Sequence, residues 1–313
     1  MAVYGIVGLS GIAALSWELV WQLEASLAIG VSARGTAITL AATMGGMAIG
    51  SLAMGAWLRG RSVPRPLRTY AWLELWIGAG GILILPGSQW LAQLDTLIWR
   101  QAPGLAPGLH LLGIAALVAV PTLAMGATVP VLARVAASYR LSLAGLYGSN
   151  LIGAALGVLL MTFVGLPEFG VRASCGVLVS INVLGAAAAL LWPAGLTVKA
   201  VAEESLEPAA PATFSSGLSS LAAFSTGFAT FGLEVAWFRS LRAAFQHTTD
   251  SFAIVLVSLL VPLAVVSRLV PCSARRGFSL GFLMPLPDLG VLCVPPFFHR
   301  FACLLFHPHL SFV

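Results

Sequence analysis

Residues 14–30 read ALSWELVWQLEASLAIG, a stretch that is apolar enough to lie in a bilayer. It nevertheless holds two acids, Glu18 and Glu24, and two tryptophans, Trp17 and Trp21. An acid near the centre of a bilayer costs on the order of 2–3 kcal/mol, so acids in membrane helices usually face the interior of the bundle. The stretch therefore predicts a transmembrane helix with a polar inward face.

The whole chain has the composition of an integral membrane protein. Of its 313 residues, 59% are hydrophobic and only 9% are charged, and the mean hydropathy is +0.97. A soluble domain has roughly 25% charged residues, so a soluble globular fold is excluded. The net charge of +5 does not indicate nucleic-acid binding, because the basic residues lie in short loops between apolar runs.

Apolar runs of spanning length recur along the chain. Each is about as long as a helix needs to cross some 30 Å of hydrocarbon. We predict an all-α fold, a polytopic transmembrane helix bundle of about eight spans. The predicted spans lie near residues 3–29, 36–58, 69–89, 109–132, 143–165, 171–193, 216–245 and 251–270.

Basic residues in the loops predict the orientation. The segment RGRSVPRPLR, residues 59–68, follows the second span, and further basic residues follow the fourth, sixth and eighth. These further residues are Arg134, Arg140, Lys199, Arg268, Arg275 and Arg276. Because cytoplasmic loops are rich in Lys and Arg, we expect a cytoplasmic N-terminus in a cell inner membrane.

Two segments of the chain have similar sequences when both are read from N- to C-terminus. SGIAALSWELVW at residues 10–21 aligns with TGFATFGLEVAW at residues 226–237, and the alignment continues without a gap over residues 10–51 and 226–267. Ten of the 42 aligned pairs are identical, including the rare pattern Gly-x6-Glu-x2-Trp. We interpret this as a parallel internal repeat, like that relating the halves of major-facilitator transporters.

The repeat divides the chain into four parts. Residues 1–193 form a first membrane half of six spans, and residues 194–215 form a cytoplasmic linker rich in Glu and Pro. Residues 216–270 begin a second half that is incomplete, with two spans. Residues 271–313 form an atypical tail that corresponds poorly to the first half after Ser51. Such a tail indicates either a truncated or frame-shifted end or a divergent one.

The repeated acids are the first candidates for chemistry. Glu18 and Glu234 occupy equivalent positions, each one turn before a tryptophan, Trp21 or Trp237. One interpretation is proton, cation or amine binding, in which the aromatic face adds a cation–π contact. The other is that the acids bond neighbouring helices and the tryptophans pack the bundle or lie in the interfacial belt.

Three further polar residues are candidates for ligand or ion contacts. Glu74 lies early in the third span, where it is either structural or functional, and Arg239 either pairs with an acid or snorkels outward. Asn150 enters the fifth span, and we expect it to bond across helices. Glu24 has no counterpart in the second copy, where Ser240 takes its place, and we expect it to lie near the outer boundary.

Two sets of residues concern packing. Small residues recur at four-residue spacing, at Gly46/Gly50, Ser51/Gly55 and Gly153/Gly157, and predict seams where helices approach closely. Pro121 and Pro130 predict a break or kink in the fourth span.

No motif of a soluble enzyme is present. The chain has no Walker A, HExxH or GxSxG sequence, and its four cysteines form no CxxC pair or zinc-type Cys/His spacing. We therefore predict no catalytic residues, no cofactor and no metal.

The quoted elements, together with MGGMAIGS, PTLAMGATVPVLAR and LYGSNLIGAALGVLLMTFVGLPEFGVR, resemble the membrane domain of fused major-facilitator/spermidine synthase-like proteins. The resemblance covers residues 5 to about 193 and 221–267. It implies a cytoplasmic aminopropyltransferase domain as a partner, but no motif of such a domain occurs in this chain. The family pattern places Arg two residues after the Trp, which Arg239 matches and Leu23 does not.

Three functional hypotheses follow. In the first, the membrane domain of a spermidine synthase-like protein binds or moves a small cationic or amine solute, or anchors an aminopropyltransferase. On that hypothesis this chain does not catalyse aminopropyl transfer by itself. The alternatives are an independent secondary transporter with Glu18 and Glu234 as coupling groups, and a purely structural anchor.

Overall fold

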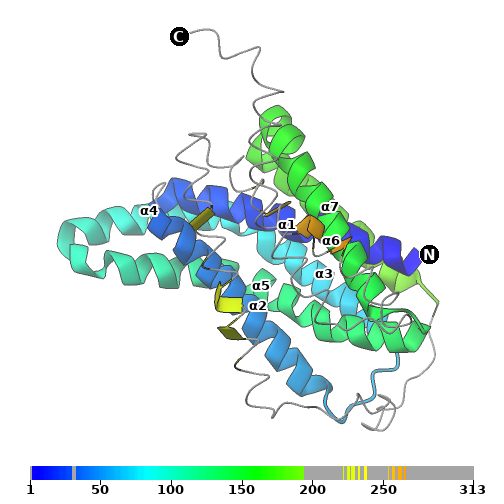
Figure 1. Cartoon of the computed structure of the whole chain (residues 1–313). Coiled ribbons are helices and arrows are strands. Elements are labelled where there is room, and N and C mark those ends of the chain that lie inside the picture. Colours follow the sequence, from blue (N-terminus) through cyan, green and yellow to red (C-terminus); the bar gives the residue numbers. More distant parts are fainter. Residues whose placement is uncertain are drawn as a thin grey trace.

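The computed structural model describes residues 2–29 and 33–193, together with scattered positions between 221 and 265. These positions are 221, 224, 225, 227–229, 232, 236, 237, 253, 256, 257, 260–262, 264 and 265. The helices are α1 (Ala2–Ile29), α2 (Ala33–Leu58), α3 (Pro66–Ile82), α4 (Ile84–Gln101), α5 (Ala106–Tyr139), α6 (Leu143–Leu160) and α7 (Gly170–Leu191). A 3₁₀ turn (Pro103–Leu105) precedes α5, and a π-helical segment (Met161–Phe169) joins α6 to α7. The described residues contain no strand, which confirms the all-α prediction (Figure 1).

Several of these helices are suited to a membrane. In the described part of the chain, four helical segments are long and apolar enough to cross a bilayer: Ala2–Ala28, Gly35–Leu58, Gly108–Tyr139 and Leu143–Leu191. A fifth exists if α3 and α4, which are bent by 41° at their junction, count as one broken span. The chain is therefore compatible with a multi-pass membrane protein. Most of the two spans predicted beyond residue 215 lies outside the described residues.

The segment Leu143–Leu191 reverses its direction. With 49 residues it would be about 73 Å long if straight, more than twice the hydrocarbon thickness of about 30 Å. However, Leu146 near its start and Ala189 near its end belong to one apolar cluster with Val3. The reversal occurs at the π-helical segment, where Gly170 has a φ of +72° that favours glycine. Figure 1 shows α6 and α7 as two green arms that converge away from the N-terminus.

Glycines allow two pairs of helices to touch through their backbones. A Cβ added to Gly153 of α6 would lie 2.0 Å from the carbonyl oxygen of Gly8 in α1, and one added to Gly50 of α2 would lie 2.0 Å from that of Leu123 in α5. A larger residue at these positions would separate the helices. The predicted packing seams at Gly46/Gly50 and Gly153/Gly157 are thus confirmed, whereas a Cβ added to Gly55 of the pair Ser51/Gly55 would have no atom within 4 Å.

One apolar cluster gathers several helix ends at the N-terminal end of the bundle. It joins the beginnings of α1, α3 and α6 to the ends of α2, α5 and α7. Its members include Val3, Leu58, Leu67, Val135, Leu146 and Ala189. Arg134 strengthens this end, because its Nη2 donates a hydrogen bond of 2.9 Å to the carbonyl oxygen of Leu58. The loop that carries Arg59 and Arg61 and the turn that carries Arg140 therefore leave the bundle at one end.

Two local predictions need correction. Of the break or kink predicted in the fourth span, the break does not occur, because α5 runs from Ala106 to Tyr139 through both Pro121 and Pro130. The third span, predicted over residues 69–89, ends as a straight helix at Ile82, and the chain continues after the bend as α4. Residues 84–101, which include the end of that predicted span, form α4.

Candidate functional site: buried carboxyl groups beside α1

Glu74 of α3 is fully buried and bonded to two other helices. Its side chain has 0% exposure. Oγ of Ser10, from α1, donates a hydrogen bond of 2.5 Å to Oε1 of Glu74. Nδ2 of Asn182, from α7, donates one of 2.8 Å to Oε2. A single carboxyl group thus connects three helices that are distant in sequence.

Trp17 extends this network by one bond. Its Nε1 donates a hydrogen bond of 2.9 Å to Oδ1 of Asn182. Because the indole N–H is only a donor, the amide of Asn182 must direct its oxygen to Trp17 and its nitrogen to Glu74. We call Ser10, Trp17, Glu74 and Asn182 the Glu74 cluster. All four residues are at most 5% exposed.

Tyr70 lies beside the cluster without completing it. It is fully buried one helical turn before Glu74, and its hydroxyl is close to Glu74 and Ser10. The hydroxyl makes no hydrogen bond to any described residue. The hydroxyl of Tyr70 is therefore a hydrogen-bond donor close to the Glu74 carboxyl group that the cluster does not use.

No basic side chain balances Glu74 in the part of the chain that the structure describes. The only ion pair among the described residues joins His110 to Asp95. Arg134 is bonded to a backbone carbonyl of α2, and Arg61 lies over the ring of Trp57. The partners of Glu74 are thus neutral donors, and no described cation neutralises a charge on its carboxyl group.

Glu18 also faces the interior, as the sequence predicted. It is 3% exposed. Trp17 and Trp21, which flank it on α1, are stacked with their ring centroids 6.3 Å apart and their planes at 17°. Trp21 is 1% exposed, so it lies in the bundle core and not in an interfacial belt. Nε1 of Trp21 and Oε1 of Gln22 are buried and have no hydrogen-bond partner among the described residues.

Glu24 is bonded to α4. It is half-buried, and Oγ of Ser88 in α4 donates a hydrogen bond of 2.6 Å to its Oε2. The bend between α3 and α4 places Ser88 against the last turns of α1, an arrangement that a straight third span would not produce. Glu24 is therefore a link between helices.

Of the remaining candidate residues, the structure describes Asn150 and Trp237. Nδ2 of Asn150 donates a hydrogen bond of 3.2 Å to the carbonyl oxygen of Val7, which confirms the predicted bond across helices. Trp237 is partly buried and packs against the apolar core that contains Trp17 and Trp21. Glu234 and Arg239 lie outside the described residues.

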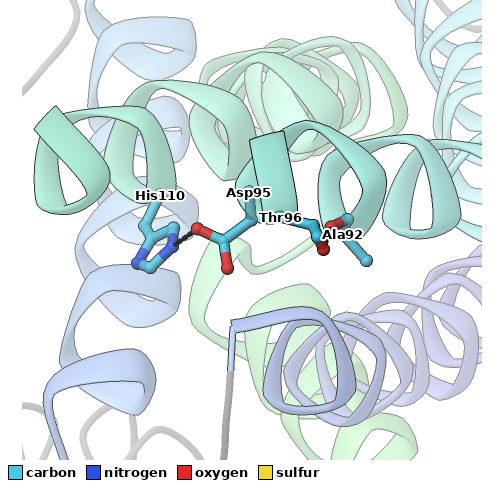
Figure 2. Close-up of polar contacts among 4 residues, drawn as sticks. All are labelled: Ala92, Asp95, Thr96 and His110. Atoms are coloured by element: carbon cyan, nitrogen blue, oxygen red, sulfur yellow. Dashed lines mark hydrogen bonds and ion pairs between the residues drawn. The ribbon is translucent and has the colours of Figure 1, made fainter. Parts of the chain in front are cut away.

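His110 and Asp95 form a second polar contact that the sequence reasoning missed. The His110 Nε2 and Asp95 Oδ1 atoms are 2.6 Å apart, and the pair joins the beginning of α5 to α4 (Figure 2). Their side chains are 18% and 25% exposed. Beside them, Oγ1 of Thr96 bonds back to the carbonyl oxygen of Ala92 at 3.0 Å. The pair links α4 and α5 close to the turn that connects them.

The sequence reasoning did not name Ser10 and Asn182 as candidates. Both are small polar residues within apolar runs, and a search for any polar residue inside a span would have found them. Their convergence on Glu74 depends on the packing of α1 and α7 against α3. No group of three or more His, Cys, Asp or Glu that could hold a metal occurs among the described residues.

A cavity of about 180 Å³ lies between α1, α6 and α7. Most of its lining is apolar, and the polar side chains that it includes are those of Ser16 and Ser174. No residue of the Glu74 cluster lines it. The chain matches no known protein-family model, no curated protein and no solved structure.

Proposed function

We propose that this chain is the membrane domain of a fused major-facilitator/spermidine synthase-like protein, and that it binds or moves a small cationic or amine solute. The elements that resemble this family fall on α1, α2, α5 and the α6–α7 hairpin. An aminopropyltransferase domain or subunit, absent from this chain, is the proposed cytoplasmic partner. The lipid bilayer is the environment that the apolar helices favour.

The observation that carries this proposal is the position of Glu18. The acid lies in the bundle interior next to a stacked pair of tryptophans. A carboxylate attracts an ammonium group, and an indole face adds a cation–π contact that can exceed about 2 kcal/mol when it is desolvated. Trp21 Nε1 and Gln22 Oε1 supply a donor and an acceptor without partners among the described residues. These groups match the chemistry of a polyamine.

We further propose about eight spans in two parallel halves, with the second half incomplete. The reversal between α6 and α7 supports six crossings within residues 2–193. Trp237 packs against the same core as Trp17 and Trp21, in keeping with a second copy of the Glu-x-x-Trp element facing the first. The proposed repeat relates residues 10–51 to residues 226–267.

The proposed orientation has a cytoplasmic N-terminus in a cell inner membrane. The cluster of helix ends around Val3 and Leu58 supports it, because the Arg-rich loops leave the bundle at the same end as the N-terminus. Arg59 and Arg61 are exposed there. Basic loops stay on the cytoplasmic side.

The test is binding and uptake of radiolabelled spermidine by the full chain in proteoliposomes. Glu18→Gln should abolish binding, whereas Glu168→Gln is the matched control, since Glu168 is exposed on the segment between α6 and α7. Uptake by the wild-type chain without any transferase would favour the independent transporter. If the wild-type chain and the Glu18→Gln variant both fail to bind or take up spermidine, the result favours a structural anchor that has no ligand.

A further inference from the structure

The Glu74 cluster has the parts of a reversible proton-binding site. Glu74 is fully buried in apolar helices, and its hydrogen-bond partners are the neutral side chains of Ser10 and Asn182. Burial disfavours the ionised form, while two donors aimed at its oxygens favour it. Opposing influences of this kind make both protonation states accessible to one carboxyl group.

Asn182 acts as a fixed support for either state. Trp17 holds the amide oxygen, so Nδ2 donates to Oε2 of Glu74 whether or not the carboxyl is protonated. This bond cannot reverse, because the –NH₂ group has no lone pair to accept with. The proton is thereby directed to the other oxygen, Oε1.

Ser10 is the partner that can reverse. A hydroxyl group both donates and accepts, so Ser10 donates to Oε1 of the carboxylate and accepts from the O–H of the acid. In proton uptake, a hydronium ion from the aqueous phase loses one O–H bond and becomes water, and a new O–H bond forms on Oε1. The Ser10 hydroxyl then accepts a hydrogen bond from that O–H instead of donating one to Oε1.

Among the described residues, the helices that pack against α3 bring no compensating charge to the site. On α5, His110 is bonded to Asp95, Arg134 to the carbonyl oxygen of Leu58 and Tyr139 to that of Pro193. On α7 the titratable groups are Arg172, which is exposed, and Cys175. On α1, Glu18 lies two helical turns beyond Ser10. Tyr70, on α3 itself, is the titratable side chain that lies beside Glu74.

We propose that Glu74 takes up and releases a proton inside the bundle, with Ser10 as its reversible hydrogen-bond partner and Asn182–Trp17 as its fixed support. The site shares Trp17 with the amine site proposed at Glu18 but uses a different carboxyl group, and the proton exchange does not require an amine. Because the carboxyl group joins α1, α3 and α7, the change in its protonation changes the bonds among these three helices.

The test is infrared spectroscopy of the full chain in lipid nanodiscs over a range of pH. The wild-type protein should show a carboxylic-acid C=O band that decreases as the pH rises and shifts on transfer to D₂O. Glu74→Gln should remove this band, whereas the matched variants Glu18→Gln and Glu168→Gln should retain it. Ser10→Ala should keep the band and displace both its frequency and its midpoint pH.

The outcomes separate the alternatives. A band that persists unchanged to the highest pH at which the protein stays folded would overturn the proposal, because Glu74 would be a static neutral acid. A wild-type spectrum without the band at any pH would also overturn it, since Glu74 would then be permanently ionised. If Glu74→Gln does not fold, Ser10→Ala decides, because a band that this variant leaves unmoved does not belong to Glu74. Spermidine binding plays no part in these measurements, so their result is independent of the proposed function.

Discussion

Nε1 of Trp17 donates a hydrogen bond of 2.9 Å to Oδ1 of Asn182, which lies 165 residues further along the chain. This bond sets the orientation of the amide that reaches Glu74. Trp17 thereby has a role that its neighbour Trp21 does not share, although both rings are fully buried and stacked. Of the two stacked rings on α1, Trp17 belongs to the polar network around Glu74, whereas Trp21 lies in the apolar core and its Nε1 has no hydrogen-bond partner among the described residues.

The first prediction concerns Asn182. Asn182→Leu should lower the free energy of unfolding by about 2 kcal/mol, because it leaves the indole N–H of Trp17 and one oxygen of Glu74 without partners in the bundle interior. The measurement is the thermal unfolding midpoint in detergent. Ser180→Ala is the matched control, since Ser180 is exposed on the same helix and bonds only to the backbone of its own helix. Equal midpoints for the two variants would show that the bond contributes nothing.

The second prediction concerns the contact between α1 and α6. Gly153→Ala should destabilise the protein by about 1–3 kcal/mol, because the new methyl group overlaps the carbonyl of Gly8 and forces the helices apart. Gly176→Ala, in open space on α7, should leave stability unchanged or raise it slightly. Thermal unfolding of both variants checks this. A tolerated alanine at position 153 would mean that α1 and α6 do not touch through their backbones.

The third prediction concerns the reversal at the π-helical segment. Single cysteines introduced at Ser142 and Trp192, in a background lacking the native cysteines, should react with a membrane-impermeant maleimide from the same side of the membrane. A cysteine at Glu168 should react from the opposite side, because it lies where α6 turns into α7. All three positions are exposed. Labelling of Ser142→Cys and Trp192→Cys from opposite sides would contradict the hairpin.

The fourth prediction concerns the ion pair in the α4–α5 hairpin. A double-mutant cycle with Asp95→Asn and His110→Gln should give a coupling energy of up to about 1 kcal/mol, since both side chains are partly exposed. The midpoint of thermal unfolding measures each variant. The coupling should decrease with added salt, because ions screen such pairs. Additive effects of the two substitutions would show that the pair does not stabilise the hairpin.

The sequence alone determined that this chain consists of apolar helices, and it also determined which faces carry polar groups. Helix length and apolarity depend on local composition, so the first six runs were located to within several residues. The burial of Glu18 and the cross-helix bond of Asn150 could also be predicted, because a polar group in a span must face a partner.

Only the tertiary structure decided which polar groups meet. Glu74 was one candidate among several in the sequence, and Ser10 and Asn182 were not candidates. Their contact requires Ser10 on α1, Glu74 on α3 and Asn182 on α7 to lie at the same level along the bundle. The close contact of α1 and α6 at Gly8 and Gly153 and the reversal at Met161–Phe169 contribute to this alignment. The bend at Leu83 lies between Gly80–Gly81 and Pro86–Gly87, which favour a helix end, but the contact of Ser88 with Glu24 depends on the position of α1. Spacing along a helix fixes the face on which a residue lies, whereas the identity of its partner depends on the rotation and depth of another helix.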